Sequence, residues 1–232
     1  EMCIRDSQST IWIFMEKLNM KILKTICIIL LVYTVSAGIL FDVPRLPILN
    51  ETIRVLYFHV PMWFTMIFLL FLSSINAYRF ISSGDLSYDL KSYNYANIGV
   101  FFGVLGIISG MIWAKYTWGT YWTNDPKLNG SAVGLLIYFS YFVLRNSVED
   151  ESKKGKISSV YNILAFSMLI PLIFILPRMT DSLHPGNGGN PGFNVYDLNS
   201  QLRIVFYPAV IGFILLGIWI ADLRLRILKL KN

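Results

Sequence analysis

The stretch "YANIGVFFGVLGIISGMIWA", Tyr95 to Ala114, decides the fold class of this 232-residue chain. It contains no charged residue and is long enough to cross a bilayer, which takes roughly 17–25 helical residues. Further apolar segments occupy residues 22–41, 55–80, 129–146, 160–177 and 204–221. Only 15% of the chain is charged, whereas a soluble domain carries about 25%. The sequence therefore predicts an all-α, polytopic membrane bundle of about six transmembrane helices.

The first residues do not follow this pattern. Residues 1–14, "EMCIRDSQSTIWIF", lack the basic, apolar and small-residue order of a signal peptide. The letters "MCIRDS" resemble a translated sequencing adaptor. We therefore expect 1–14 to be a non-native leader, with the protein starting at Met15 or Met20, and 15–232 to form a single integral membrane domain.

The distribution of basic residues predicts the orientation of the bundle, because Lys and Arg accumulate in loops that stay in the cytoplasm. Thirteen Lys and Arg residues flank the segments on one side, and six flank them on the other: Arg45, Arg54, Lys115, Lys127, Arg178 and Arg203. We expect both termini in the cytoplasm and the connections 42–54, 115–128 and 178–203 outside. The net charge of +6 then reflects membrane topology and calls for no nucleic-acid partner.

Several classes of chemistry lack their motifs. The two cysteines, Cys3 and Cys27, form neither C-x-x-C nor C-x-x-C-H, which argues against dithiol chemistry and against a c-type cytochrome. The sequence has no P-loop or dinucleotide fingerprint, so ATP would have to be used by a partner. The glycines of the 95–114 segment recur at helical spacing, and we interpret them as a helix-packing face: Gly99, Gly103, Gly106 and Gly110.

The outer connections carry the unusual residues. The stretch "YTWGTYWTNDPKLNG", Tyr116 to Gly130, concentrates large rings in one short connection. Both histidines of the chain, His59 in "LYFHVP" and His184 in "LHPG", are expected on the same outer side. Function on a helical scaffold tends to lie in the loops that the scaffold positions. The outer face is therefore the predicted site.

These residue types suit a flat iron-containing ligand. Two imidazoles can fill both axial positions of heme iron, and Trp118, Tyr121 and Trp122 can supply aromatic walls. Candidate cations for the propionates are Arg54, Lys115, Lys127, Arg178 and Arg203. Simpler interpretations remain open at this point. Each histidine can be a packing residue, the rings can form an interfacial belt, and "HPGNGG" can be only a turn.

The combination "WGTYWTNDPKL" with "LYFHVP" and "LHPG" resembles the CcmC/CcsA-type heme-handling family of cytochrome c maturation, over nearly the whole chain from about residue 20. The resemblance implies that His59 and His184 are axial ligands of a transiently bound heme b. It also implies that a tryptophan-rich loop, here 115–128, holds the heme beside the membrane. The loop residues that it implicates are Trp118, Gly119, Tyr121, Trp122, Asp125 and Pro126.

The resemblance also implies partners and a location. Such proteins sit in the bacterial inner membrane with their functional loops in the periplasm. They present heme to a membrane-anchored heme chaperone, alongside an ATP-binding-cassette pair and a small accessory membrane protein. Where the family commonly has tryptophan, this chain has Tyr121 and Asn124. Tyrosine keeps a stacking face but asparagine does not, so one wall of the site is expected to be thinner or supplied elsewhere.

We therefore expect heme delivery rather than catalysis, although larger relatives act as heme lyases or synthases. One alternative is a b-type electron-transfer subunit, which usually sets its histidines at matched depth within spans. Another is a small-solute transporter, which would place ionisable residues near mid-membrane. The apolar segments of this chain show little beyond Asn and Ser there.

Overall fold

A computed structural model describes residues 2–46, 48–180, 182–184 and 198–231 of the chain. These residues form an all-helical bundle without strands. In order along the chain, its elements are α1 (Met2–Leu40), the 3-10 turn η1 (Asn50–Val55), α2 (Leu56–Ser83), α3 (Leu86–Trp118), α4 (Pro126–Ser147), α5 (Glu151–Ile170), the π-helical turn η2 (Pro171–Ile175), α6 (Leu176–Met179) and α7 (Ser200–Lys231).

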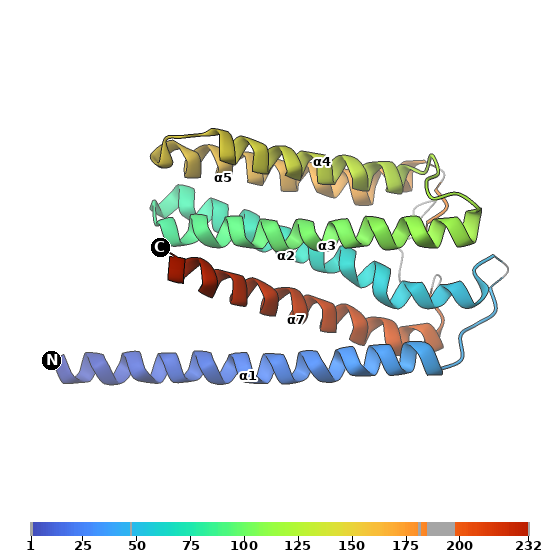
Figure 1. The fold of residues 1–232 in the computed structure, drawn as a ribbon, viewed down its shortest axis with the longest axis horizontal. Coiled ribbons are helices and arrows are strands. Elements are labelled where there is room, and N and C mark those ends of the chain that lie inside the picture. The colour runs from blue at the N-terminus through green and yellow to red at the C-terminus, as the bar shows by residue number, and fades with distance from the viewer. Residues whose placement is uncertain (1, 47, 181, 185–197, 232) are drawn as a thin grey trace.

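Six stretches of the described chain are long and apolar enough to cross a membrane, as predicted: Met20–Leu40, Asn50–Ser83, Leu86–Trp118, Pro126–Ser147, Lys153–Met179 and Ser200–Leu230. The long helices run up and down along one axis, and both termini lie at the same end (Figure 1). We call the other end, with the connections 41–49, 119–125 and 180–199, the loop end. In the last of these connections, Asp181 and residues 185–197, including the predicted "PGNGG" turn, lie outside the described residues.

The helix ends follow from local sequence signals. Gly84 ends α2 and Gly119 ends α3, each with a positive φ (74° and 82°) that costs glycine little. Asp85 and Asp125 cap the first turns of α3 and α4. The helix α3 continues through the first aromatic residues of this stretch to Trp118, and it ends only at Gly119. The ring-rich connection is therefore residues 119–125, which is shorter than the predicted 115–128.

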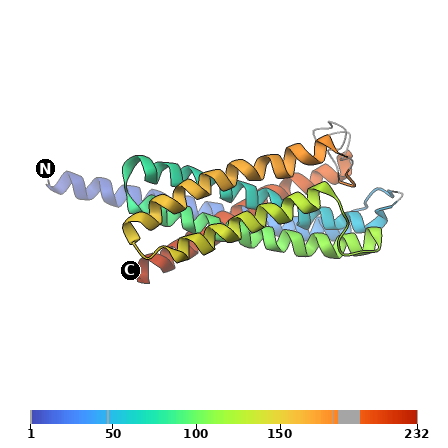
Figure 2. The ribbon, with the colours of Figure 1, turned by 90° about the horizontal axis from the view of Figure 1, so that it is seen from above.

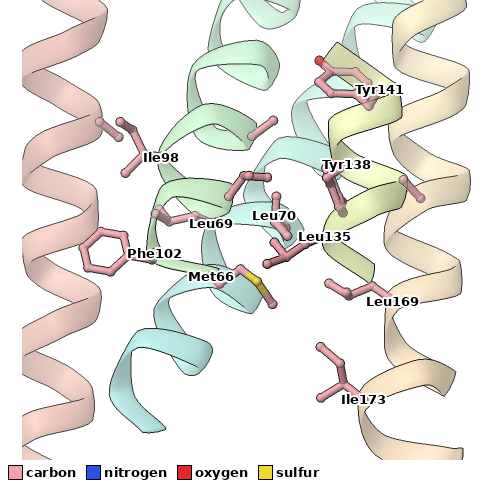
Figure 3. Packing of buried hydrophobic residues seen from close by; sticks show 14 residues of the cluster. Met66, Leu69, Leu70, Ile98, Phe102, Leu135, Tyr138, Tyr141, Leu169 and Ile173 are labelled. Carbon is pink, nitrogen blue, oxygen red and sulfur yellow. The ribbon is translucent and has the colours of Figure 1, made fainter. Parts of the chain in front are cut away.

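The main core lies between α2, α3, α4 and α5. Met66 and Leu70 of α2 are fully buried there and lie beside Leu135 of α4, whereas Leu69, also fully buried, lies on the side of Phe102 (Figure 3). The α3 glycines allow α2 to approach closely. A Cβ on Gly103 would lie 2.5 Å from the sulfur of Met66. The packing face predicted for these glycines is therefore present, and it faces α2.

A second core joins α1 and α7 to the loop-end half of α2. Tyr57 of α2, Ala37 of α1 and Phe206 of α7 are buried in it.

Seen from above, α1 extends beyond the other helices at its N-terminal end (Figure 2). The outward faces of the helices are apolar, with exposed side chains that include Ile29, Val32, Phe101, Leu136, Val143 and Leu164. Such surfaces suit lipid rather than water.

Candidate functional site

A cavity lies at the loop end of the bundle, enclosed by α2, α3, α4 and η2. His59 and His184 both line it, although 125 positions of sequence separate them. Most of the remaining wall is apolar and includes Val60, Phe64, Ile67, Met111, Leu128 and Phe174. The fold therefore places the two predicted ligands on one shared apolar space.

His59 is held by a hydrogen-bond chain between α2 and α3. Its ring Nδ1 lies 3.0 Å from the hydroxyl of Ser109, and that hydroxyl donates to the carbonyl of Gly106 at 3.0 Å. Because the serine proton is used on Gly106, Nδ1 of His59 must be the donor in the first bond. The other ring nitrogen, Nε2, then keeps its lone pair and has no hydrogen-bond partner among the described residues.

Two tryptophans and two glycines fix the ring of His59. The rings of Trp63 and Trp113 meet it edge-on, at centroid distances of 6.3 and 5.7 Å. A Cβ on Gly110 would lie 2.7 Å from Cε1 of His59, and a Cβ on Gly106 would lie 2.9 Å from the indole of Trp63. Glycine is therefore needed at both positions for these rings to occupy their places.

Asp125 holds His184. Its carboxylate is buried, and Oδ1 lies 3.0 Å from Nδ1 of His184 while Oδ2 accepts from Leu183 N–H at 2.7 Å and from the Ser182 hydroxyl at 2.8 Å. The same Oδ1 caps α4 by accepting from Lys127 N–H at 2.9 Å. One carboxylate thus joins the start of α4 to the turn that carries His184.

These contacts keep Asp125 ionised. Burial raises the pKa of Asp125, but the hydrogen bonds from His184, Leu183 and Ser182 and the charge of His184 outweigh burial and hold that pKa well below its usual range. An ionised Asp125 accepts the Nδ1 proton of His184, which fixes the orientation of the imidazole ring. A carboxylate behind an imidazole also raises its basicity as a ligand.

The residues of the predicted 115–128 loop contribute unequally to the cavity. Trp122 lines it, and Trp118 lies edge-on to His184 with a centroid distance of 5.5 Å. Tyr121 is 56% exposed and lies beside the ammonium of Lys115, 5.5 Å from its ring centroid, so it does not line the cavity. Gly119 and Pro126 act on the backbone, since Gly119 ends α3 and Pro126 begins α4.

Asn124, where the resemblance led us to expect tryptophan, is tied to Trp122. The amide of Asn129 donates to Oδ1 of Asn124 at 2.8 Å, and Oδ1 of Asn129 accepts from the indole N–H of Trp122 at 3.2 Å. Asn124 does not line the cavity. Through Asn129 it helps to hold Trp122, which forms part of the cavity wall. Trp63 of α2 and Trp113 of α3 supply further aromatic walls.

Of the proposed propionate cations, Lys127 lines the cavity. Arg54 instead pairs with Glu51 at 2.8 Å and donates to the carbonyls that end α1. Lys115 donates to the carbonyl of Gly119 at 2.8 Å. Neither these two nor Arg178 and Arg203 line the cavity among the described residues.

The donor set fits a flat, apolar ligand with a metal centre. Two imidazoles line the cavity, indole rings and aliphatic side chains form its walls, and Lys127 adds one cation. Ser109, Trp63 and Trp113 were not predicted as site residues. Ser109 and Trp113 lie in the apolar segment Tyr95–Ala114, and only the pairing of α2 with α3 brings them to His59.

Comparisons with known proteins show which proteins the chain resembles. The family model described as heme exporter protein C (CcmC) matches residues 5–231. The chain is similar to heme exporter protein C of Escherichia coli strain K12, with 26% identity over 184 residues, which is 76% of this chain and 70% of the relative. It is similar to the Bradyrhizobium diazoefficiens protein of the same name, with 22% identity over 78% of this chain and 68% of that relative.

A shorter match links the chain to a second group. The cytochrome c biogenesis protein CcsA of Morus indica is 38% identical over 87 residues, which is 38% of this chain. The chain spans only 26% of that relative's length. Because the family model covers nearly all of the described helices, the chain belongs to the heme exporter protein C family.

Proposed function

We propose that this protein binds heme in the loop-end cavity and hands it on during the biogenesis of c-type cytochromes. The observation that carries the proposal is that both histidines of the chain line one apolar cavity, each held by a hydrogen bond at Nδ1, so that Nε2 is the nitrogen left for iron among the described contacts. The names of its relatives, heme exporter protein C and cytochrome c biogenesis protein CcsA, support the same role.

His59 and His184 would be the axial ligands, and bound heme would supply an iron with two axial positions for them. Trp63, Trp113 and Trp122 would face the porphyrin, and Lys127 is the candidate partner for a propionate. Heme would be a cargo that is bound transiently, and the protein would act as a handover component rather than as an enzyme.

Release would begin at His184. This side chain is 19% exposed and lies in a connection, whereas His59 lies inside α2 and is 7% exposed. Exchange of one ligand requires an opening through which the acceptor can reach it. We therefore infer that an acceptor, a membrane-anchored heme chaperone, replaces His184 while His59 keeps its place.

The orientation proposed is the one that the basic residues favour, with the loop end on the periplasmic side of a bacterial inner membrane. An ATP-binding-cassette pair and a small accessory membrane protein would complete the assembly. This arrangement would place the ring-rich connection and His184 where a chaperone anchored to the same membrane can reach them.

The test is a visible spectrum of the protein purified in mild detergent and titrated with hemin. We expect a Soret band typical of two imidazole ligands, shifted or lost in His59→Ala and in His184→Ala. Leu183→Ala is the matched control, because Leu183 is 58% exposed and holds Asp125 through its backbone N–H. If both histidine variants keep the wild-type spectrum, the ligand assignment is wrong.

A second measurement separates handover from electron transfer. A b-type subunit should be reduced rapidly and reversibly by a quinol and should retain its heme in the presence of an acceptor. Here we expect transfer of heme to a purified chaperone, with slow reduction by quinol. Fast reduction without transfer would contradict the proposed function.

A further inference from the structure

At the end opposite the loop end, α3, α4 and α7 meet at one aromatic ring. The guanidinium of Arg145 lies 4.8 Å from the ring centroid of Tyr93, and that of Arg224 lies 5.4 Å from the same centroid. Arginines stack on tyrosine faces because the ring quadrupole attracts the cation. We call Asp89, Tyr93, Asn94, Arg145 and Arg224 the Tyr93 cluster.

The charges of the Tyr93 cluster do not cancel. Arg145 forms a bidentate ion pair with Asp89, in which Nη1 donates to Oδ1 at 2.8 Å and Nη2 donates to Oδ2. The side chains of Arg145 and Asp89 are 11% and 13% exposed. Arg224 has a neutral acceptor, Oδ1 of Asn94 at 3.0 Å. No carboxylate of the described residues lies within ion-pair distance of Arg224, so one positive charge remains uncompensated.

The unused donors of Arg224 are held in position. A guanidinium has five N–H groups, and Asn94 accepts from one nitrogen of this side chain. Asn94 is itself buried and fixed, because its amide donates to the carbonyl of Ala221 at 2.8 Å. The guanidinium of Arg224 is therefore oriented by protein contacts and still has donors available for a further acceptor.

The depth of the cluster suggests what that acceptor is. The apolar segments of these helices begin at residue 95 and end at residues 146 and 221, so Tyr93, Arg145 and Arg224 all lie at the edge of the hydrocarbon region. Arg224 lies about 4–5 Å along the helix axis beyond residue 221. This is the level of lipid headgroups, where basic pockets between helices bind anionic lipids.

We propose that Arg224 binds the phosphate of an anionic phospholipid at the boundary of α3 and α7. Guanidinium pairs well with phosphate through parallel N–H···O bonds. One phosphodiester would cancel the charge that Asp89 leaves uncompensated. The neighbouring Arg145, already paired, adds attraction without competing for the ligand. This site lies at the opposite end from the histidine cavity and does not depend on the heme function.

The chain offers a matched control on the same helix. Arg226 has the same charge, is 52% exposed and pairs with Asp222 at 2.9 Å. It therefore has the carboxylate that Arg224 lacks. The proposal requires Arg224→Gln, but not Arg226→Gln, to affect lipid binding. Arg224→Lys keeps the positive charge but replaces the planar guanidinium with an ammonium group. It therefore tests whether the paired N–H donors of the guanidinium are needed for binding.

The experiment is a titration of the purified full chain in neutral detergent with short-chain phosphatidylglycerol, phosphatidylcholine or inorganic phosphate, read by native mass spectrometry and by thermal melting. We expect selective retention of phosphatidylglycerol by the wild type and by Arg226→Gln. Arg224→Gln should bind about tenfold more weakly, the loss expected for a charge-assisted pair. Arg224→Lys should fall between the two.

Three outcomes would overturn the proposal. Equal weakening in Arg224→Gln and Arg226→Gln would show attraction to surface charge in general. Equal retention of phosphatidylcholine would show that the anionic headgroup is not recognised. A response to inorganic phosphate that matches the response to phosphatidylglycerol would assign the site to free anions. If Arg224→Gln melts far below the wild type without lipid, Arg224→Lys decides the question alone.

Discussion

At the scale of single residues, both histidines are held through Nδ1, but by partners of different kinds. His59 donates its Nδ1 proton to a neutral hydroxyl inside the bundle, whereas His184 donates to a carboxylate in a connection. A partner of this kind fixes the tautomer and the ring orientation of a metal-binding histidine. The polar neighbours should therefore matter nearly as much as the histidines themselves.

Ser109 tests this idea for His59. In Ser109→Ala, Nδ1 loses its acceptor, and we expect heme affinity to fall roughly 10–100-fold, the usual cost of losing such a partner. Titration of the Soret band against hemin measures the affinity. Ser140→Ala is the control, because that exposed hydroxyl donates within α4 and lies outside the cavity. Equal affinities for the two variants would show that Ser109 does not act on the site.

Asn129 tests the anchoring of Trp122. In Asn129→Leu the indole loses its acceptor and Asn124 loses its link to the wall. We expect acrylamide to quench Trp122 more strongly, as measured by subtracting the emission of a Trp122→Phe background. Asn129→Asp retains the acceptor oxygen and should remain close to the wild type. If the Leu and Asp variants quench alike, the asparagine pair does not hold the ring.

At the scale of elements, one side chain connects α4 to the His184 turn. Asp125 serves as helix cap, as partner of His184 and as acceptor for Ser182 and Leu183. Its counterpart at the opposite end, Asp85, is exposed and caps α3 through Ser87. Asp125→Ala should therefore destabilise the protein far more than Asp85→Ala, by about 3 kcal/mol for the buried charge-assisted bonds. Thermal or chemical denaturation of both variants in detergent measures the difference.

The lowered pKa of Asp125 makes the stability of the junction between α4 and the His184 turn depend on pH. Because the pKa is lower in the folded state, the stabilisation is complete above the unfolded value of about 4 and is lost as the pH falls further. In Asp125→Asn the new side chain would still cap the helix. The difference in melting temperature between the wild type and Asp125→Asn should therefore persist from about pH 7 to 5 and shrink below about pH 4. A constant difference at still lower pH would contradict the proposed ionisation.

At the scale of the whole molecule, the two ends of the bundle are separated by a packed core. Met66, Leu70 and Leu135 pack against one another in this core (Figure 3). The cavity is formed by side chains from α2, α3, α4 and η2, whereas the far end is joined by the Asp89–Arg145 ion pair between α3 and α4. A substitution in the Asp89–Arg145 pair should therefore lower the stability of the protein without changing heme binding in the cavity.

Breaking the buried pair tests this separation. Asp89→Asn leaves Arg145 without its partner and should cost about 3–5 kcal/mol of stability, measured by denaturation in detergent. The heme spectrum should not change, because the cavity is at the other end. Asp222→Asn, which breaks the exposed pair with Arg226, should cost at most about 1 kcal/mol. A changed Soret band in Asp89→Asn would show that the ends are coupled.

The sequence by itself determined the helices and their order. Charge-free segments such as Tyr95–Ala114 can satisfy their backbone in lipid only as helices, and glycine and aspartate marked the ends of α2, α3 and α4. The alternation of spans placed His59 and His184 at one end. The choice of Lys127 over Arg54 could not be predicted, because it depends on which cation the packing of the helices brings to the cavity, and Arg54 is instead directed to Glu51 and to the end of α1.

Only the tertiary structure decided which residues serve the histidines. Ser109, Trp113 and Gly110 belong to an apolar helix whose pattern reports burial but not the partner of each face. From the sequence, Asn124 indicated only the loss of an aromatic wall. The structure shows that it accepts a hydrogen bond from Asn129, the residue that holds Trp122. Hydropathy fixes which segments enter the membrane, whereas side-chain contacts between helices depend on rotation and register, which arise only when the surfaces of the helices pack together.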